Sequence, residues 1–390
     1  MTGLPAEFLG YARTTGPAGV RNHLLILSVC GLNAPQARKL GAALPHAVLI
    51  STDYGRGQVG EDKAFHARML TAFGTHPNTG AVIVLAADAA MRTQYQDAIE
   101  ATNRPCAGFS LQEEDEDAEA MLAAATQAGR ALGAALDRQP RVPCPVTDLF
   151  LAMECGHSDA SSGIMANPLV GDVADAIGKA GGRAVFSETL EWTGAEDSLY
   201  RRCADPRIAD TLRALVAERH RIARTAGHDV ALGNPGPQNH AGGLTTLEEK
   251  SLGAVSKGGT GPIVGALEQG RPPEAGPGLY LMDTPTLSPE SLSSMVAAGA
   301  QIAFFTTGHG NPYGSAIAPT IKVTANPDTA RRVPRQIDFD ASAAFAGAVT
   351  RADLVAPLLE LVIRVAEGAP TCAETLDECA EAISRLGPSI

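Results

Sequence analysis

The chain has 390 residues, 45% of them hydrophobic and 19% charged, so it is long enough for two domains and too apolar to be disordered. Its formal net charge of −12 argues against a nucleic-acid or anionic-membrane partner. The seven cysteines form no CxxC pair, the N-terminus has no signal-peptide pattern, and no apolar run reaches the ~20 residues that cross a bilayer. We therefore expect a cytoplasmic protein with reduced cysteines.

The first part of the chain alternates strands and helices. Apolar runs at residues 23–29, 47–52 and 81–87 predict strands, and PCAGFS at 105–110 predicts a fourth. Helical patterns follow them, the last beginning at LQEEDEDAEA, whose acidic residues suit a helix N-terminus. Unbroken apolar strands that alternate with helices predict a parallel sheet covered on both faces. We assign residues 1–140 to an N-terminal α/β domain.

The same pattern restarts after a proline-rich linker, DRQPRVPCPVTD. Runs at 149–153, 184–188, 278–283 and 301–308 predict strands of a second α/β domain, residues 146–390, which carries most of the site. The predicted fold is α/β, with two Rossmann-like domains and mainly parallel sheets. A Cys-Gly pair follows the first strand of each half, which indicates either a weak internal duplication or only the common pattern of strand ends.

An irregular, glycine-rich region spans residues 227–262. Loops this long in compact domains are usually functional or disordered. It contains a predicted helix from Thr245 to Ser256, with a threonine cap and a glutamate placed for a capping box, so order is the better interpretation.

Polar residues follow four predicted strands of the second half, where ligands of open α/β sheets bind. The four segments are Cys155–Asp159, Ser187–Glu188, Asp283–Thr284 and Thr306–Gly310. We expect them to share one site.

The segment MECGHSDASSG, residues 153–163, is the densest of these. Cys155, His157 and Asp159 alternate, so in an extended segment they face the same way and are candidate metal ligands, a thiolate and an imidazole being suited to iron or zinc. The alternative is that Cys155 packs as a small hydrophobe and Asp159 caps a turn. The following Asn167-Pro168 predicts a helix N-cap.

Two further motifs carry candidate residues. Lys257 opens KGGTG, whose glycines let backbone amides approach a ligand, and Lys250 precedes it by two helical turns. Lys257 is a candidate for contact with a substrate carboxylate, and Lys250 is either a second cation there or a surface residue. In FFTTGHGNPYG, the flanking glycines give His309 room to reach a substrate, which suits a catalytic histidine.

Several long motifs in the right order resemble the altronate/galactarate dehydratase family, to which sulfolactate sulfo-lyase large subunits also belong. They are GYARTTGPAGVRNHLLIL, CGHSDASSGIMANPLVG, residues 233–262, FFTTGHGNPYGSAIAPTIKV and IDFDAS. The resemblance runs from about residue 10 to about residue 342. It implies β-elimination from a small hydroxy or sugar acid: a base removes the proton α to a carboxylate, and a divalent metal, iron or manganese rather than zinc, helps a hydroxyl or sulfonate depart.

Mapped onto this sequence, the resemblance and the motifs give one set of candidates. The catalytic candidates are Cys155, His157, Lys257 and His309; the substrate-binding candidates are Ser158, Asp159, Asn239, His240, Lys250, Thr306 and Thr307; and the metal candidates are Cys155, His157 and Asp159.

This sequence departs from the family pattern in three ways. The turn STDYGRGQVGED, residues 51–62, lacks the usual His and Cys, and His240 stands where a lysine or arginine is common. The small N-terminal SAF-type domain of the single-chain dehydratases is absent; either a separate small SAF-domain subunit supplies it as a partner, or it is dispensable. The other expected partner is a small carboxylate substrate. A homo-oligomer is the default expectation.

Two alternatives to a metal-assisted lyase stay open. One is a hydrolase on the same scaffold that uses Cys155, His157 or His309. The other is a small-acid-binding homologue without catalysis. Arg56 in place of the usual cysteine favours these alternatives, and the retained CGHSD and TTGHG motifs favour an active lyase.

Overall fold

The computed structural model of the chain describes residues 3–387, apart from the side chains of residues 231 and 232. It forms two compact units. Unit 1 comprises Met1–Phe8 and Pro145–Cys379, and unit 2 comprises Leu9–Cys144 and Ala380–Ile390, so the chain crosses between them three times. Strands β1 (Glu7–Gly10) and β6 (Val142–Pro145) contain two of these crossings and pair as a two-stranded sheet. Among the described residues, no helix has the length and hydropathy that a membrane crossing requires.

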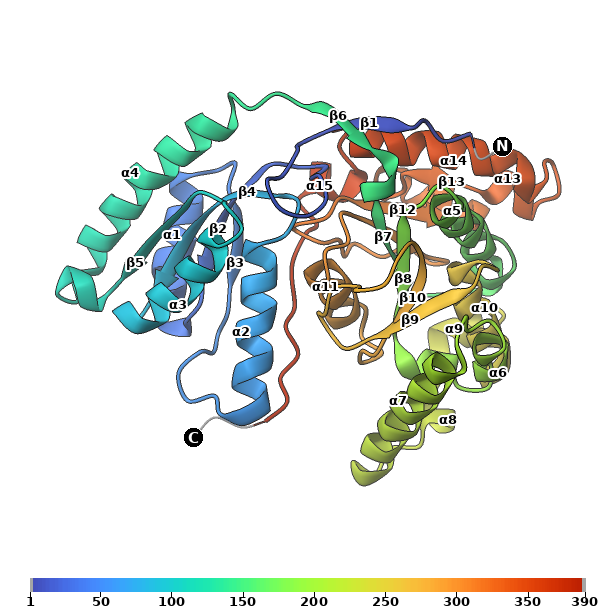
Figure 1. Cartoon of the computed structure of the whole chain (residues 1–390). Helices are drawn as coiled ribbons and strands as arrows, with labels where there is room; N and C mark the ends of the chain where they lie inside the picture. Colours follow the sequence, from blue (N-terminus) through green and yellow to red (C-terminus); the bar gives the residue numbers. More distant parts are fainter. Residues whose placement is uncertain (1–2, 388–390) are drawn as a thin grey trace. The chain divides into compact units, whose positions relative to one another are not determined.

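Unit 2 is built on a four-stranded parallel sheet in the order β3-β2-β4-β5. Helices α1 and α4 pack together on the sheet, and α2 packs with α3 (Figure 1). The core between the sheet and the α1–α4 pair is aliphatic, with Ile26, Leu40, Ile83 and Met121 inaccessible to solvent. The element bounds are β2 His23–Ser28, β3 Val48–Ser51, β4 Thr79–Ala86, β5 Cys106–Ser110, α1 Ala34–Ala43, α2 Gly60–Gly74, α3 Ala89–Glu100 and α4 Ala118–Leu136.

Unit 1 is built on a seven-stranded parallel sheet in the order β13-β12-β11-β7-β8-β10-β9. Its strands are β7 Phe150–Cys155, β8 Arg183–Phe186, β9 Ile263–Leu267, β10 Gly278–Met282, β11 Ile302–Thr306, β12 Thr320–Thr324 and β13 Phe339–Asp340. Its helices are α5 Asn167–Lys179, α6 Glu196–Tyr200, α7 Pro206–Thr225, α8 Val230–Gly233, α9 Pro237–Ala241, α10 Leu247–Val255, α11 Ser288–Ala297, α12 Pro327–Arg332, α13 Ser342–Phe345, α14 Arg351–Ala366 and α15 Cys372–Leu376.

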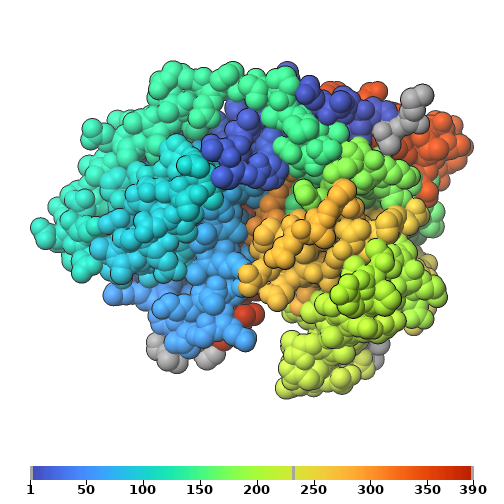
Figure 2. Space-filling model, in the orientation of Figure 1, coloured from blue at the N-terminus to red at the C-terminus, as the bar shows by residue number. Residues whose placement is uncertain are grey.

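The strand order of unit 1 marks where a ligand site belongs. After β7 the chain forms β8, β9 and β10 on one side of β7, and it then returns to form β11, β12 and β13 on the other. Residues that follow β7 and its neighbours therefore lie at the carboxyl edge near a topological switch point, where open parallel sheets bind ligands. Helix α7 lies at the same end of unit 1: its Arg219 pairs with Asp283, which follows β10, and it contacts the turn after β8. It extends from the sheet (Figure 1) as a yellow-green projection of unit 1 in the space-filling view (Figure 2).

The predicted α/β class with parallel sheets is confirmed. All eight predicted strands are present, within a few residues of their expected bounds, whereas β1, β6, β9, β12 and β13 were not predicted. The predicted helix in the glycine-rich region is also present as α10, and the Thr246 hydroxyl caps it by accepting from the Glu249 amide.

The N-cap interpretation of Asn167 is wrong. A π-helical turn, Ser162–Ala166, runs directly into α5, so Asn167 is the first residue of the helix and its side chain caps nothing. Instead, Asn167 Nδ2 donates to the Gly253 carbonyl and Asn167 Oδ1 accepts from the Thr306 hydroxyl. The side chain therefore joins α5 to α10 and β11.

Candidate active site

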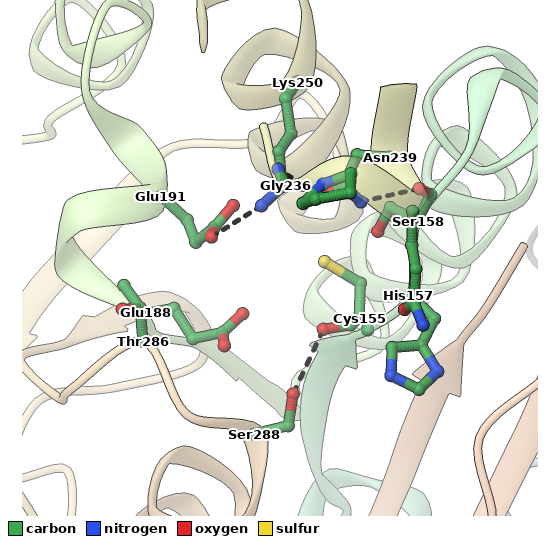
Figure 3. Close-up of a pocket in the computed structure, with 13 residues that line it drawn as sticks. Cys155, His157, Ser158, Glu188, Glu191, Gly236, Asn239, Lys250, Thr286 and Ser288 are labelled. Atoms are coloured by element: carbon green, nitrogen blue, oxygen red, sulfur yellow. Dashed lines mark hydrogen bonds and ion pairs between the residues drawn. The ribbon is translucent and has the colours of Figure 1, made fainter. Parts of the chain in front are cut away.

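A cavity of about 490 Å³ opens at the carboxyl edge of β7 and β8 in unit 1. Figure 3 shows the Cys155 sulfur and the Glu188 and Glu191 carboxylates turned toward it. Cys155 is the last residue of β7, and Glu188 follows β8 by two residues. The lining consists of Cys155, Gly156, His157, Ser158, Glu188, Glu191, Gly236, Pro237, Gln238, Asn239, Lys250, Thr286 and Ser288.

A buried lysine lies against the floor of this cavity. Lys257 is 1% exposed, and its Nζ donates to the Cys155 sulfur at 3.1 Å and lies 3.7 Å from Glu188 Oε2. The same ammonium lies 5.8 Å from the centroid of the Phe186 ring, within the range of a cation–π contact. Lys257 reaches this position from the short 3₁₀ turn after α10, Ser256–Gly258.

A second buried carboxylate adjoins this pair. Glu154 is inaccessible to solvent; its Oε1 accepts from the Cys155 amide at 2.9 Å, and its Oε2 accepts from the Ser291 hydroxyl at 2.5 Å. Ser291 also lies 2.5 Å from the Ser187 hydroxyl. One turn earlier on α11, Ser288 donates to the Cys155 carbonyl at 3.4 Å. Helix α11 thus holds the end of β7 through two serines that face the same way.

The electrostatics of the group follow from two buried carboxylates and a sulfur that share one ammonium. Burial, reinforced by the charge of Glu154, raises the pKa of Glu188 well above its ordinary value, although Lys257 opposes the change. Burial alone would lower the pKa of Lys257, but Cys155, Glu188 and Glu154 outweigh it and raise this pKa. Both directions indicate an excess of negative charge around a lysine that stays protonated.

Lys250 supplies a second cation on the wall of the cavity. Its Nζ donates to Glu191 Oε1 at 3.0 Å and also to the Asn234 side-chain oxygen. On the same side of the cavity, Asn239 Nδ2 donates to the Ser158 carbonyl at 2.8 Å (Figure 3). These contacts attach the α8–α9 segment to β7 and α10, so one irregular segment closes a side of the cavity.

His157 lies at the edge of the cavity, on the far side of Cys155 from Glu188 (Figure 3). Its φ of 52° turns the chain away from the direction of β7. The ring Nδ1 lies 2.9 Å from the Gly310 carbonyl. Because a carbonyl only accepts, Nδ1 carries the proton, and in the neutral ring the lone pair is on Nε2.

The remaining predicted site residues lie outside this cavity. Asp159 and His309 line a neighbouring hollow of about 540 Å³. The Asp159 carboxylate accepts from Ser161, Ser162 and Asn326, and His309 Nε2 lies 3.2 Å from the Gln238 carbonyl. Three other predicted residues make hydrogen bonds within the fold: Thr306 to Asn167, Thr307 to the Gly310 amide and His240 to the Leu244 carbonyl.

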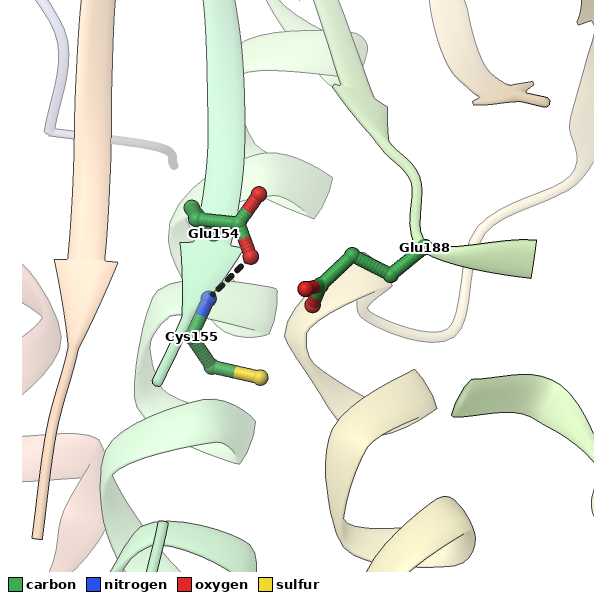
Figure 4. A group of neighbouring side chains, drawn as sticks. All are labelled: Glu154, Cys155 and Glu188. Atoms are coloured by element: carbon green, nitrogen blue, oxygen red, sulfur yellow. Dashed lines mark hydrogen bonds between the residues drawn. The ribbon is translucent and has the colours of Figure 1, made fainter. Parts of the chain in front are cut away.

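One group of metal-ligand residues comes together within residues 3–387. It consists of Glu154, Cys155 and Glu188, whose ligand atoms all lie within 4.8 Å of one another (Figure 4). It shares only Cys155 with the trio expected from the alternating pattern. Asp159 and His157, the other two members of that trio, are engaged by the hydrogen bonds given above.

Sequence reasoning did not select Glu154, Glu191 or Ser288, and it noted Glu188 only as a polar residue after a strand. Glu154 stands inside an otherwise apolar strand, FLAMEC, and a buried carboxylate there is a signal that was available. Glu191 and Ser288 come from turns whose approach to β7 depends on the tertiary fold.

The cavity lies at the carboxyl edge of a parallel sheet and is lined by convergent charged and polar groups, which is the usual place and character of a ligand or active site in such a fold. Two family models match the chain: D-galactarate/altronate dehydratase, C-terminal, over residues 146–389, and D-galactarate dehydratase/altronate hydrolase, second domain, over residues 10–136.

Curated relatives agree with this match. The chain is 34% identical to the (2R)-sulfolactate sulfo-lyase subunit beta of Chromohalobacter salexigens, over 97% of each chain. It is 32% identical to the altronate dehydratase of Escherichia coli, over 97% of this chain and 78% of the relative, and 32% identical to that of Bacillus subtilis, over 93% and 74%.

The chain belongs to the D-galactarate/altronate dehydratase family. It is therefore an enzyme, a carbon–oxygen lyase or a related lyase.

Proposed function

We propose that the chain catalyses β-elimination from a small hydroxy acid in the cavity beside Cys155. The observation that carries the proposal is the buried group of Lys257, Cys155 and Glu188, which opens on a cavity of a size suited to a small acid. The relatives are named for lyase reactions of altronate, galactarate and (2R)-sulfolactate, all small acids.

Lys250, His157 and Lys257 each have a role in this elimination. Lys250 binds the substrate carboxylate, since it is the cation on the cavity wall. The neutral His157 takes the proton from the carbon next to that carboxylate through Nε2, because Nδ1 is committed to Gly310. The electron pair of that C–H bond forms the C=C bond, the β-substituent leaves with its bonding pair, and the enol product becomes a 2-oxo acid. Lys257 holds Cys155 and Glu188 in place.

A divalent metal is part of the proposal, and the chemistry of the donor set fits one. Glu154, Cys155 and Glu188 offer two carboxylates and a thiolate, which iron and manganese accept. In the deprotonated form that binds a metal, these three groups and the ammonium of Lys257 would sum to two negative charges, which a divalent ion would balance. These three residues would hold the ion, and when bound it supplies a Lewis acid for the departing group.

Metal content tests this assignment without an activity assay. Protein purified without chelator should carry about one equivalent of iron or manganese per chain. Glu188→Gln should reduce that content about tenfold, and Asp159→Asn should leave it unchanged. A metal content that falls in Asp159→Asn and not in Glu188→Gln would contradict this set of ligands. Wild-type protein purified without bound metal would contradict the proposal that the enzyme uses a metal.

The reaction is tested with altronate, galactarate and (2R)-sulfolactate in D₂O. Elimination followed by ketonisation places a solvent deuterium on the carbon that lost its substituent, and the product is a 2-oxo acid. Hydrolysis, the alternative that Cys155 or His309 allows, introduces no carbon-bound deuterium. A catalysed reaction without this deuterium would refute β-elimination, and saturable binding of the acids without turnover would favour a binding protein.

We also propose that a separate small subunit completes the enzyme. In support, the relative from Chromohalobacter salexigens is named as one subunit of its enzyme. Native mass spectrometry of the enzyme from its source cells should show a second chain. A native mass that is a whole multiple of 40.2 kDa would instead indicate a homo-oligomer of this chain.

A further inference from the structure

A second cavity, of about 490 Å³, lies in unit 2 between α2 and α3. Val29, which follows β2, and Asp88, which follows β4 and caps α3, mark its position at the carboxyl edge of the sheet. The chain leaves β2 toward β3 on one side and returns to β4 on the other, so the cavity adjoins the switch point of this sheet. Open parallel sheets bind ligands at such a point, and the proposed elimination uses no residue of this unit.

The two helices present small and apolar side chains to the cavity. Ala64, Ala67 and Leu70 are spaced along one face of α2, and Ala90 and Met91 lie on the first turn of α3. The three alanines, Ala64, Ala67 and Ala90, leave room between the two helices for an apolar group.

One buried polar group at this cavity has no hydrogen-bond partner in the part of the chain that the structure describes: His66 is 3% exposed and its Nε2 is unpartnered. Buried imidazoles normally find partners, so this nitrogen points to a ligand. Tyr95, which is 6% exposed as a residue, also lines the cavity and makes no hydrogen bond with a described residue, but its hydroxyl is not fully buried. Burial raises the pKa of Tyr95 to about 12, which keeps the phenol a donor at neutral pH.

The charge at the mouth of the cavity selects an anion. Lys63 lines it, is exposed, and forms no ion pair with any residue between 3 and 387. The nearby carboxylates are engaged: Asp88 accepts from the Met91 amide and lies 3.8 Å from Arg56, and Asp62 bonds to Gln58 and to the Leu386 amide. No side chain caps the N-terminus of α2, whose partial positive charge stands beside the acidic Glu61 and Asp62 of its first turn.

We propose that this cavity binds a small carboxylate with an apolar body. The carboxylate accepts from Lys63, the apolar body lies between α2 and α3, and a polar atom at its other end accepts from Tyr95. The site is independent of the cavity at Cys155 and serves a ligand other than the substrate.

The test uses the full chain and 4-hydroxybenzoate as the probe, with 4-hydroxybenzamide as its neutral analogue and isothermal calorimetry as the measurement. Saturable binding of the acid is expected, about tenfold tighter than that of the amide. Tyr95→Phe and Lys63→Met should each weaken it about fivefold, and Ala67→Phe, which fills the cavity, should abolish it. Melting curves establish that each variant folds.

Two matched variants locate the binding. Lys39→Met removes an exposed lysine of α1, which packs with α4 rather than with α2, and Lys250→Met removes the cation of the cavity in unit 1. Both should bind the probe as the wild type does. The proposal is overturned by an absence of saturable binding, by binding that Lys63→Met and Tyr95→Phe leave unchanged, by loss of binding in Lys250→Met, or by displacement of the probe with inorganic phosphate.

Discussion

The ammonium of Lys257 lies 3.1 Å from the sulfur of Cys155, although 102 residues separate them in the sequence. A lysine that is 1% exposed loses its hydration, and only strong local partners compensate for that loss. Cys155 and Glu188 are those partners, and both line the cavity. The contacts of Lys257 therefore hold together three segments: the end of β7, the turn after β8 and the turn after α10.

Lys257→Met should remove activity as well as stability. The substitution leaves two buried carboxylates and a sulfur without a cation, which costs about 3–5 kcal/mol of unfolding free energy, and kcat/KM should fall at least about a hundredfold. Lys322→Met is the matched control, because Lys322 is equally buried in unit 1 and pairs with Glu378 at 3.4 Å, away from the cavity. It should lower the melting temperature similarly and preserve kcat per folded molecule. Equal kcat losses in the two variants would show that Lys257 acts only on stability.

Ser291→Ala should lower kcat about tenfold, because it removes the donor that orients Glu154 Oε2. Ser294→Ala is a close control: Ser294 lies on the same helix, is equally buried, and bonds only to the Glu290 carbonyl of its own helix. Steady-state kinetics and melting curves of both variants separate the two roles. If Ser294→Ala loses as much kcat as Ser291→Ala, packing of α11 and not the Glu154 contact is responsible.

Lys250→Met should act mainly on substrate affinity. With Lys250 as the carboxylate-binding cation, its loss should raise KM about tenfold to a hundredfold and change kcat less. Lys179→Met, on the exposed last turn of α5, should change neither constant. A fall in kcat at constant KM would assign Lys250 to the chemical step instead.

Because His66 is buried, we expect the free energy of unfolding to fall in acid. Burial lowers the pKa of His66 below its ordinary value of 6.5, and Arg385 adds to this against the opposing charge of Asp62. The unfolded chain therefore binds the proton first, so this part of the stability is present above about pH 6.5 and is lost as the pH falls through the lowered pKa. The melting temperature of the wild type should fall between about pH 7.5 and about pH 5.

His66→Gln should flatten this fall, since the glutamine side chain does not titrate in that range. His46→Gln, which changes an exposed histidine of the same unit, should follow the wild-type curve. A slope that is the same in all three proteins would show that other groups set the acid limit.

The strands were predictable because each is a short, unbroken apolar run, and the parallel sheets followed from their alternation with helices. The position of Cys155 at a strand end was predictable for the same reason. Strand β12, TIKVT, was missed because a buried Lys322 interrupts its apolar pattern, and only the tertiary fold gives that lysine its partner, Glu378. The expected pair of Rossmann-like domains stays a prediction, and the choice between a weak internal duplication and the common pattern of strand ends stays open.

The candidate site was harder to predict than the fold. The period of a strand indicated that Cys155, His157 and Asp159 face the same way, but β7 ends at Cys155 and the next residues turn, with His157 at a φ of 52°. Alternation therefore does not apply beyond Cys155. Glu154 and Glu188 come close because adjacent parallel strands end together, a relationship that needs the strand order.

The last segment of the chain completes a unit whose other residues are made first. Leu386 donates its amide to Asp62 at 3.0 Å, Arg385 lies 3.8 Å from the same carboxylate, and the Arg385 guanidinium lies 4.3 Å from the centroid of the Tyr54 ring. These partners are separated by 324 residues in the case of Asp62 and Leu386. At ordinary translation rates, the ribosome takes roughly tens of seconds to cover that distance. During that time the nascent unit 2 keeps the start of α2 uncovered, and these contacts form only after residues 385 and 386 have been made.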